Sequence, residues 1–174
     1  TTARQQIPFA SIRAERSTFQ QGEMMTEIFE YPQIIFDTET TGITGGRVIE
    51  IGAVVIDTSG EVVSEFDTLV WRSRDILYSP RSAEALSINN IDREEVLNSG
   101  ISEQEAGEKF AKWIAESKEN FGAKCMRAYN QQFDFGKIRR PPLDPFMHDG
   151  GSIPEGECIM MASYKLMHKA GKLV

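Results

Sequence analysis

The sequence has little of what would place a protein in a membrane, in an oxidising compartment or along a nucleic-acid duplex. No apolar run approaches the roughly 20 residues of a membrane-spanning helix. Only two cysteines are present, Cys125 and Cys158, and they lie far apart without metal-ligand spacing. They favour a reduced, cytoplasmic protein over a disulfide scaffold. The net charge of −7 argues against a broad basic surface. The negative net charge does not exclude an enzyme that binds a few phosphates, because metal-binding acids also lower the formal charge.

The bulk composition predicts one globular domain behind a polar arm. The chain has 174 residues, of which 40% are hydrophobic and 26% charged, enough for a sizeable core. Residues 1–33 are polar without a clear period, and we expect a flexible or loosely packed N-terminal arm there. Residues 34–174 form the predicted domain. Met24-Met25, just before the first strand, is a candidate start of the native protein.

One stretch combines a buried strand with two acids: Ile34-Ile35-Phe36-Asp37-Thr38-Glu39-Thr40-Thr41-Gly42. Ile and Phe suit a pleated core, and the polar cluster ends the run. Side chains at i and i+2 of a strand share a face, so Asp37 and Glu39 project together. Two carboxylates converging at a sheet edge repel each other unless a cation or a proton lies between them. Their hard oxygens suit Mg²⁺ or Mn²⁺. The alternative is an exposed acidic turn, but the strand before the acids and the Thr-Thr-Gly after them favour a metal site.

The remaining patterns predict an α/β domain with a mixed central sheet. The Asp37 strand begins a three-strand antiparallel meander, which alternating helices and strands then follow. Ser102 and Glu105 form a capping-box signature for one long helix. The other predicted elements are strands over Val48–Asp57, Val62–Trp71 and Ala123–Tyr129, helices over Arg81–Leu86, Arg93–Leu97, Gln131–Ile138 and Ile159–Ala170, and loops over Arg72–Pro80 and Arg139–Glu157.

A third acid, Asp134, follows in the segment Asn130-Gln131-Gln132-Phe133-Asp134. Asn130 is the predicted N-cap of a helix, which puts Asp134 about one turn inside it, where the helix terminus favours an ionised carboxylate. Phe133 is expected to anchor this turn in the core. Alone, Asp134 would only stabilise its helix. Together with Asp37 and Glu39 it becomes a candidate partner in one metal site.

Two segments resemble the first two motifs of the DEDD-type 3′→5′ exonucleases: Phe36-Asp37-Thr38-Glu39-Thr40-Thr41-Gly42 and Tyr129-Asn130-Gln131-Gln132-Phe133-Asp134. That family includes proofreading subunits of bacterial DNA polymerases, oligoribonuclease-like enzymes and phage relatives. The resemblance covers roughly residues 34–170 in motif order, and Leu86–Ile91 resembles the intervening segment that touches the terminal nucleotide. It implies an RNase H-like fold and hydrolysis of phosphodiester bonds from the 3′ end of single-stranded DNA or RNA.

The same resemblance implies roles for particular residues. Two divalent ions, Mg²⁺ or Mn²⁺, would be held by four acids, of which Asp37, Glu39 and Asp134 are three. Such ions lie about 3.5–4 Å apart and stabilise the attacking and leaving oxygens. Thr40 would lie against the terminal nucleotide, and Ile43 would be an apolar wedge near the last bases. Further substrate contacts are implied for Asn89, Ile91, Tyr129 and Asn130, although the family often has histidine where Asn89 and Tyr129 stand.

The family's third motif, which supplies the fourth acid and a histidine or tyrosine base near the C-terminus, does not appear. His168 has no acid after it, and His148-Asp149 comes too early with the wrong spacing. We therefore interpret both histidines as ordinary polar residues. The DEDDh branch of the family is favoured, but the choice between a histidine and a tyrosine base stays open because the deciding motif is absent. Either the sequence stops before the motif, after Val174, or the protein is a degenerate relative. Without the base, hydrolysis should be slower by about 10²–10⁴.

Three functions stay open at this point. The first is a metal-dependent 3′→5′ exonuclease, the second an inactive module that binds nucleic-acid ends, and the third a metal-dependent hydrolase of small phosphate esters. The expected partners are single-stranded DNA or RNA 3′ ends, and a DNA polymerase or a second copy of the chain. No membrane partner is expected.

Overall fold

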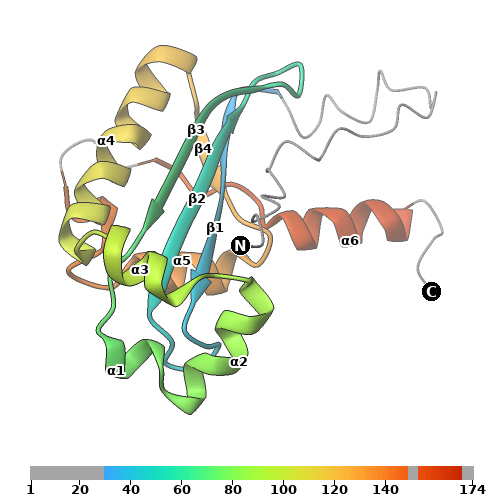
Figure 1. Ribbon diagram of the computed structural model, residues 1–174. Coiled ribbons are helices and arrows are strands. Elements are labelled where there is room, and N and C mark those ends of the chain that lie inside the picture. Colours follow the sequence, from blue (N-terminus) through green and yellow to red (C-terminus); the bar gives the residue numbers. More distant parts are fainter. Residues whose placement is uncertain (1–29, 149–152, 170–174) are drawn as a thin grey trace.

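The computed structural model describes residues 30–148 and 153–169 around one four-stranded sheet (Figure 1). The strand order is β3-β2-β1-β4. Strands β1, β2 and β3 form an antiparallel meander, and β4 pairs with β1 in parallel. Their bounds are Gln33–Thr40, Val48–Ile56, Val62–Leu69 and Cys125–Arg127. The predicted meander and mixed sheet are therefore confirmed. Residues 1–29 of the predicted arm lie outside the described residues.

Strand β1 is an inner strand, so the expectation of an edge strand was wrong. β4 pairs with it on the side away from β2, but only opposite Gln33, Ile34 and Ile35. Past Ile35 the described part of the chain places no strand beside β1 on that side. The two acids therefore lie where an inner strand gains a free backbone edge.

In the described part of the chain, the helices follow the three-strand meander in sequence. Helices α1, α2 and α3 follow β3 at one end of the sheet, α4 leads to β4, α5 follows β4, and α6 projects from the body (Figure 1). Their bounds are Arg74–Leu77, Pro80–Asn89, Arg93–Ser99, Glu103–Phe121, Gln131–Ile138 and Ile159–Lys169, with a short 3₁₀ helix, η2, over Pro145–Met147. None of the helices in the described ranges is long and apolar enough to cross a membrane.

Several predicted boundaries change for local reasons. The predicted loop Arg72–Pro80 contains α1. Helix α2 begins earlier than expected because the Ser79 hydroxyl accepts from the Ser82 N–H. It also runs on to Asn89, because the chain leaves the helix only at Asn90, in the left-handed region at φ 53°. The predicted capping contact of Ser102 is confirmed, since its hydroxyl accepts from the Glu105 N–H at 3.1 Å.

The main core fills the space between one face of the sheet and helices α4 and α5. Phe36 of β1 packs edge-on against Phe135 of α5, with ring centroids 4.9 Å apart, and tilts against Phe110 of α4 at 6.2 Å. Phe135, 3% exposed, is thus the aromatic anchor of α5. The expectation that Phe133 has this role was wrong, because Phe133 is only partly buried. A second core cluster joins α1–α3 to β2: Ile49, Leu77, Leu86, Ile91 and Val96.

The register of β1 and β2 sorts the site residues by face. Phe36 and Thr38 are buried on the core face, while Asp37 is exposed and Glu39 half-buried on the other face. Across the ladder Glu39 stands opposite Glu50, and Asp37 stands opposite Gly52. Because directly paired residues of neighbouring strands share a face, Glu50 adds a further acid beside Glu39.

Candidate active site

Asp134 brings the two sequence motifs together at the end of β1. Its Oδ1 accepts a hydrogen bond from the Thr38 N–H at 3.1 Å and another from the Thr38 hydroxyl at 2.8 Å. Thr38 lies between Asp37 and Glu39, and its nitrogen is about 1.3 Å from the carbonyl carbon of Asp37. The Asp134 carboxylate therefore occupies the free edge of β1, beside the peptide that joins the first acid to Thr38.

The local structure of α5 explains how Asp134 reaches this position. The carbonyl of Asn130 accepts from the N–H groups of Phe133 and Asp134 and so begins the helix. The Asn130 side chain is exposed and makes no capping hydrogen bond, so the expected side-chain cap was wrong. Asp134 itself is 2% exposed. Its two bonds to Thr38 replace the water that a buried carboxylate loses.

Burial and mutual repulsion perturb the ionisation of the acids. Burial, followed by the negative charges of Asp37, Glu50 and Asp134, raises the pKa of Glu39 to about 7. Burial raises the pKa of Asp134 to about 6 against the opposing hydrogen bonds from Thr38. The pKa of Asp37 is also raised by the surrounding protein, although the residue keeps an exposed surface. Placing these charges together thus costs free energy, which a cation would recover.

The donor chemistry of the acids fits a divalent cation, because carboxylate oxygens are the ligands of Mg²⁺ and Mn²⁺. Within residues 30–148 and 153–169, however, no three His, Cys, Asp or Glu side chains converge closely enough to hold a metal ion. The Asp134 carboxylate is instead hydrogen-bonded to Thr38. The metal role of Asp37, Glu39 and Asp134 therefore stays a prediction.

The raised pKa values predict how stability depends on pH in the absence of metal. Between about pH 4.5 and pH 7 the folded state binds more protons than the unfolded state, whose Glu39 titrates near its ordinary value of 4.5, so stability falls as pH rises. We expect thermal unfolding in EDTA to show this loss. Glu39→Gln should flatten it, whereas Glu84→Gln, an exposed change on α2, should not. If the stability of Glu39→Gln fell with pH as steeply as that of the unaltered protein, the raised pKa of Glu39 could not be the cause of the fall.

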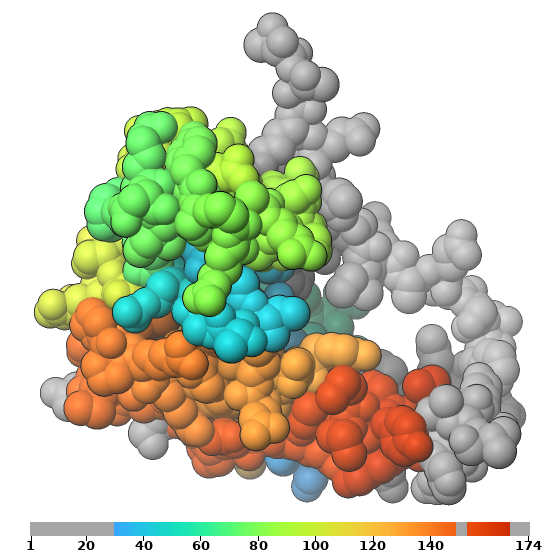
Figure 2. Space-filling view, turned by 90° about the horizontal axis from the view of Figure 1, so that it is seen from below, coloured from blue at the N-terminus to red at the C-terminus, as the bar shows by residue number. Residues whose placement is uncertain are grey.

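Two of the predicted substrate contacts lie at the loop between β1 and β2, Thr40 as the last residue of β1 and Ile43 within the loop. Thr40 is 5% exposed, and its hydroxyl donates to the carbonyl of Gly42 at 3.0 Å. Ile43 is 83% exposed at the projecting part of the loop. In the space-filling view this loop, in cyan, lies between the green helices α1–α3 and the orange segment of α5 (Figure 2). The wedge role of Ile43 stays a prediction.

The other predicted substrate contacts differ in how much of each side chain is exposed. The Asn89 side chain donates to the Thr40 carbonyl at 3.4 Å and so lies next to the loop. Tyr129 is 60% exposed just before α5. Ile91 is 7% exposed and packs in the second core cluster. Its position favours packing and leaves little of its side chain for a nucleotide.

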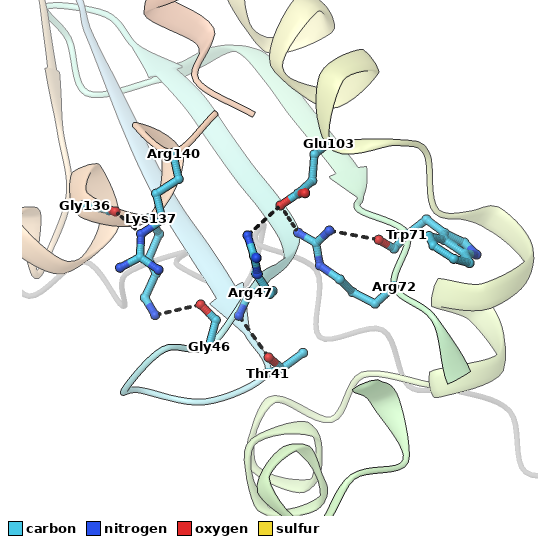
Figure 3. Close-up of polar contacts among 9 residues, drawn as sticks. All are labelled: Thr41, Gly46, Arg47, Trp71, Arg72, Glu103, Gly136, Lys137 and Arg140. Atoms are coloured by element: carbon cyan, nitrogen blue, oxygen red, sulfur yellow. Dashed lines mark hydrogen bonds and ion pairs between the residues drawn. The ribbon is translucent and has the colours of Figure 1, made fainter. Parts of the chain in front are cut away.

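Two site residues escaped the sequence analysis. Glu50 stands opposite Glu39, and only the ladder register could have shown it. Lys137 of α5 is 4% exposed, with its Nζ bonded to carbonyls of the β1–β2 loop (Figure 3). The sequence did offer a signal for Lys137, because it lies between the apolar residues Phe135 and Ile138. A lysine in a buried position is seldom unpaired.

A known protein family covers most of this region of the chain. Residues 34–148 match the family model RNase T, described as exonuclease. That span contains Asp37, Glu39, Asp134 and the β1–β2 loop. No match was found among curated proteins.

Solved structures with the same fold include exonuclease I proteins. The Escherichia coli enzyme in complex with a dA16 oligonucleotide is 19% identical, with a TM-score of 0.57 over 80% of this chain and 31% of that chain. A product-bound exonuclease I gives 20% identity and a TM-score of 0.59 over 80% of this chain and 33% of that one. The enzyme from Methylocaldum szegediense gives 19% and 0.57, with coverages of 79% and 29%. This chain spans about a third of the length of the proteins it matches, and the RNase H-like fold is the part they share.

Proposed function

Because the chain belongs to the RNase T exonuclease family, we propose that it hydrolyses phosphodiester bonds at the 3′ end of single-stranded nucleic acid, with Mg²⁺ or Mn²⁺ as cofactor. One observation carries the proposal. The Asp134 carboxylate is hydrogen-bonded to Thr38, between Asp37 and Glu39, so the second motif is tied to β1 between the two acids of the first. The family model covers the same residues.

Each acid has a distinct position from which to act. Asp37 and Glu39 present oxygens on the open face of β1, and Asp134 reaches the strand from the core side. Two divalent ions held by these acids would activate a water molecule and offset charge on the leaving oxygen. Thr40, Asn89 and Ile43, at and beside the β1–β2 loop, would orient the last nucleotide. Tyr129 and Asn130 would contact the strand from the start of α5.

The preference for single strands is supported by the fold relatives and by charge. Exonuclease I has been solved with dA16 and dT13 oligonucleotides. The net charge of −7 disfavours coating a duplex, whereas apolar side chains can stack on or separate terminal bases without reading sequence. Association with a DNA polymerase or with a second copy of the chain stays a prediction, as does the cytoplasmic location.

A module that binds ends without cutting them is the second candidate. One observation favours it: the described side chains do not form a three-ligand metal group. Both candidates use the same surface, so they differ only in whether bound ends are shortened.

The test uses single-stranded DNA and RNA labelled at either end, with Mg²⁺, Mn²⁺ or EDTA. We expect a 5′ label to give a ladder of shortened products and a 3′ label to be released first as a mononucleotide. Both signals should vanish in EDTA, and a 3′-terminal phosphorothioate should delay them. Binding without shortening would favour the second candidate. Activity confined to nitrophenyl phosphate would instead favour the phosphate-ester hydrolase, and release of a 5′ label first would contradict the polarity.

A further inference from the structure

The β1–β2 loop, residues 41–47, is closed on itself by hydrogen bonds at its base. The Thr41 N–H donates to the Arg47 carbonyl at 2.9 Å, and the Arg47 N–H donates to the Thr41 hydroxyl at 3.0 Å (Figure 3). Gly46 is packed so tightly that a Cβ added there would lie 1.8 Å from the Gly42 carbonyl oxygen. The loop therefore has a compact backbone that admits little rearrangement.

Lys137 holds this loop from the side of α5. Its Nζ donates to the carbonyls of Ile43 at 3.0 Å, Gly46 at 3.1 Å and Gly42 at 3.4 Å. A lysine ammonium has three donors, and the three carbonyls of this loop can accept from all of them. The Nζ also lies 4.7 Å from the centre of the Phe133 ring. Burying a charged group is costly unless its hydrogen bonds are made, so the loop and Lys137 depend on each other.

The same helix thereby fixes both halves of the candidate site. Asp134, three residues before Lys137, is bonded to Thr38, while Lys137 is bonded to the carbonyl of Ile43 itself. Glu103 of α4 adds a weaker tie, because Arg47 Nη1 lies 4.0 Å from its Oε1 (Figure 3). The distance between the acids and the exposed Ile43 side chain is therefore set through α5.

We propose that Lys137 is a positioning residue that holds Ile43 rigidly beside the acids and so allows the protein to attack paired as well as unpaired 3′ ends. The proposal rests on the exonuclease function proposed above. An apolar side chain can separate a terminal base pair only if the loop that carries it resists displacement. A single strand needs no separation, so it should tolerate a loosened loop better.

The test replaces Lys137 by methionine, which has similar length and no donors. Lys112→Met, at a 77% exposed lysine of α4, is the matched control. Gly46→Ala disturbs the loop independently, since its Cβ meets backbone. Rates are measured on a single strand and on a blunt duplex of the same 3′ sequence, and amide hydrogen exchange is followed over residues 41–47. Unfolding midpoints establish that each variant is folded.

In Lys137→Met and in Gly46→Ala we expect faster amide hydrogen exchange over residues 41–47. The ratio of single-strand to duplex cleavage should rise by at least about fivefold, since small misplacements of a positioning group are costly. Lys112→Met should change neither. If a variant still cleaves single strands and its ratio of single-strand to duplex cleavage is unchanged, the proposed role of Lys137 is overturned and the exonuclease function is not. Unaltered loop exchange would overturn the role of Lys137 as well. A wild-type protein that neither cleaves nor binds 3′ ends would instead overturn the proposed function.

Discussion

Replacing Asp37 by asparagine is expected to remove metal-dependent cleavage while the protein still unfolds cooperatively. The Asp37 side chain is exposed on β1, so asparagine should cost little packing. The substitution keeps the shape and deletes the charge that would hold a cation against the scissile phosphate. Loss of one preorganised group that stabilises developing charge costs about 10²–10³ in rate, and we expect a loss at the upper end of that range. Initial rates with Mn²⁺ and calorimetric titration of Mn²⁺ measure the two consequences.

Asp67→Asn is the matched control for this variant. Asp67 lies on β3 opposite Gly52, which itself stands opposite Asp37 across β2. It is therefore an acid of the same sheet, two strands from the proposed site, and its loss should leave cleavage nearly unchanged. If Asp37→Asn cleaved as fast as the unaltered protein, Asp37 would have no part in the mechanism.

The elements that could be predicted from sequence are those whose pattern is local. The run that begins at Ile34 predicted the start of β1 to within one residue, and Ser102 with Glu105 marked the start of α4. The fold class followed, because a meander joined to alternating helices and strands admits few topologies. The shared chemistry of the acids suggested that Asp134 lies near β1, and the family resemblance strengthened that hypothesis.

The remaining features depend on contacts between distant residues. β4 pairs with β1 over three residues only, a length that the pattern of residues 123–129 does not reveal. Phe133 and Phe135 are equally apolar in sequence, and only the packing of Phe36 against Phe135 separates them. Lys137 lies among apolar residues, where a lysine is surprising until the loop carbonyls appear beside it. The register that sets Glu50 against Glu39 likewise depends on the closure of the loop at Thr41 and Arg47.

Asp134→Asn is expected to separate the structural role of this residue from its chemical one. The Asp134 Oδ1 accepts both hydrogen bonds from Thr38, and an amide oxygen in its place can accept them too. The tie between α5 and β1 should survive, and the unfolding midpoint at neutral pH should stay or rise, because burial opposes the charge that is removed. Cleavage should nevertheless fall by about 10²–10³ if the charge holds a cation for catalysis.

Two companion variants make the result decisive. Asp134→Ala removes the acceptor as well and leaves two Thr38 donors unsatisfied, which should cost about 1–3 kcal/mol in the free energy of unfolding. Thr38→Val removes only the hydroxyl bond and keeps the carboxylate, so it should destabilise by about 1 kcal/mol and retain most of the cleavage. The opposite pattern, in which Asp134→Asn cleaves normally but is as unstable as Asp134→Ala, would reduce Asp134 to a packing tie. Because Asp134 is the residue through which the second motif reaches the first, that outcome would leave Asp37 and Glu39 as an isolated acidic pair, and the proposed nuclease site would lose its third acid.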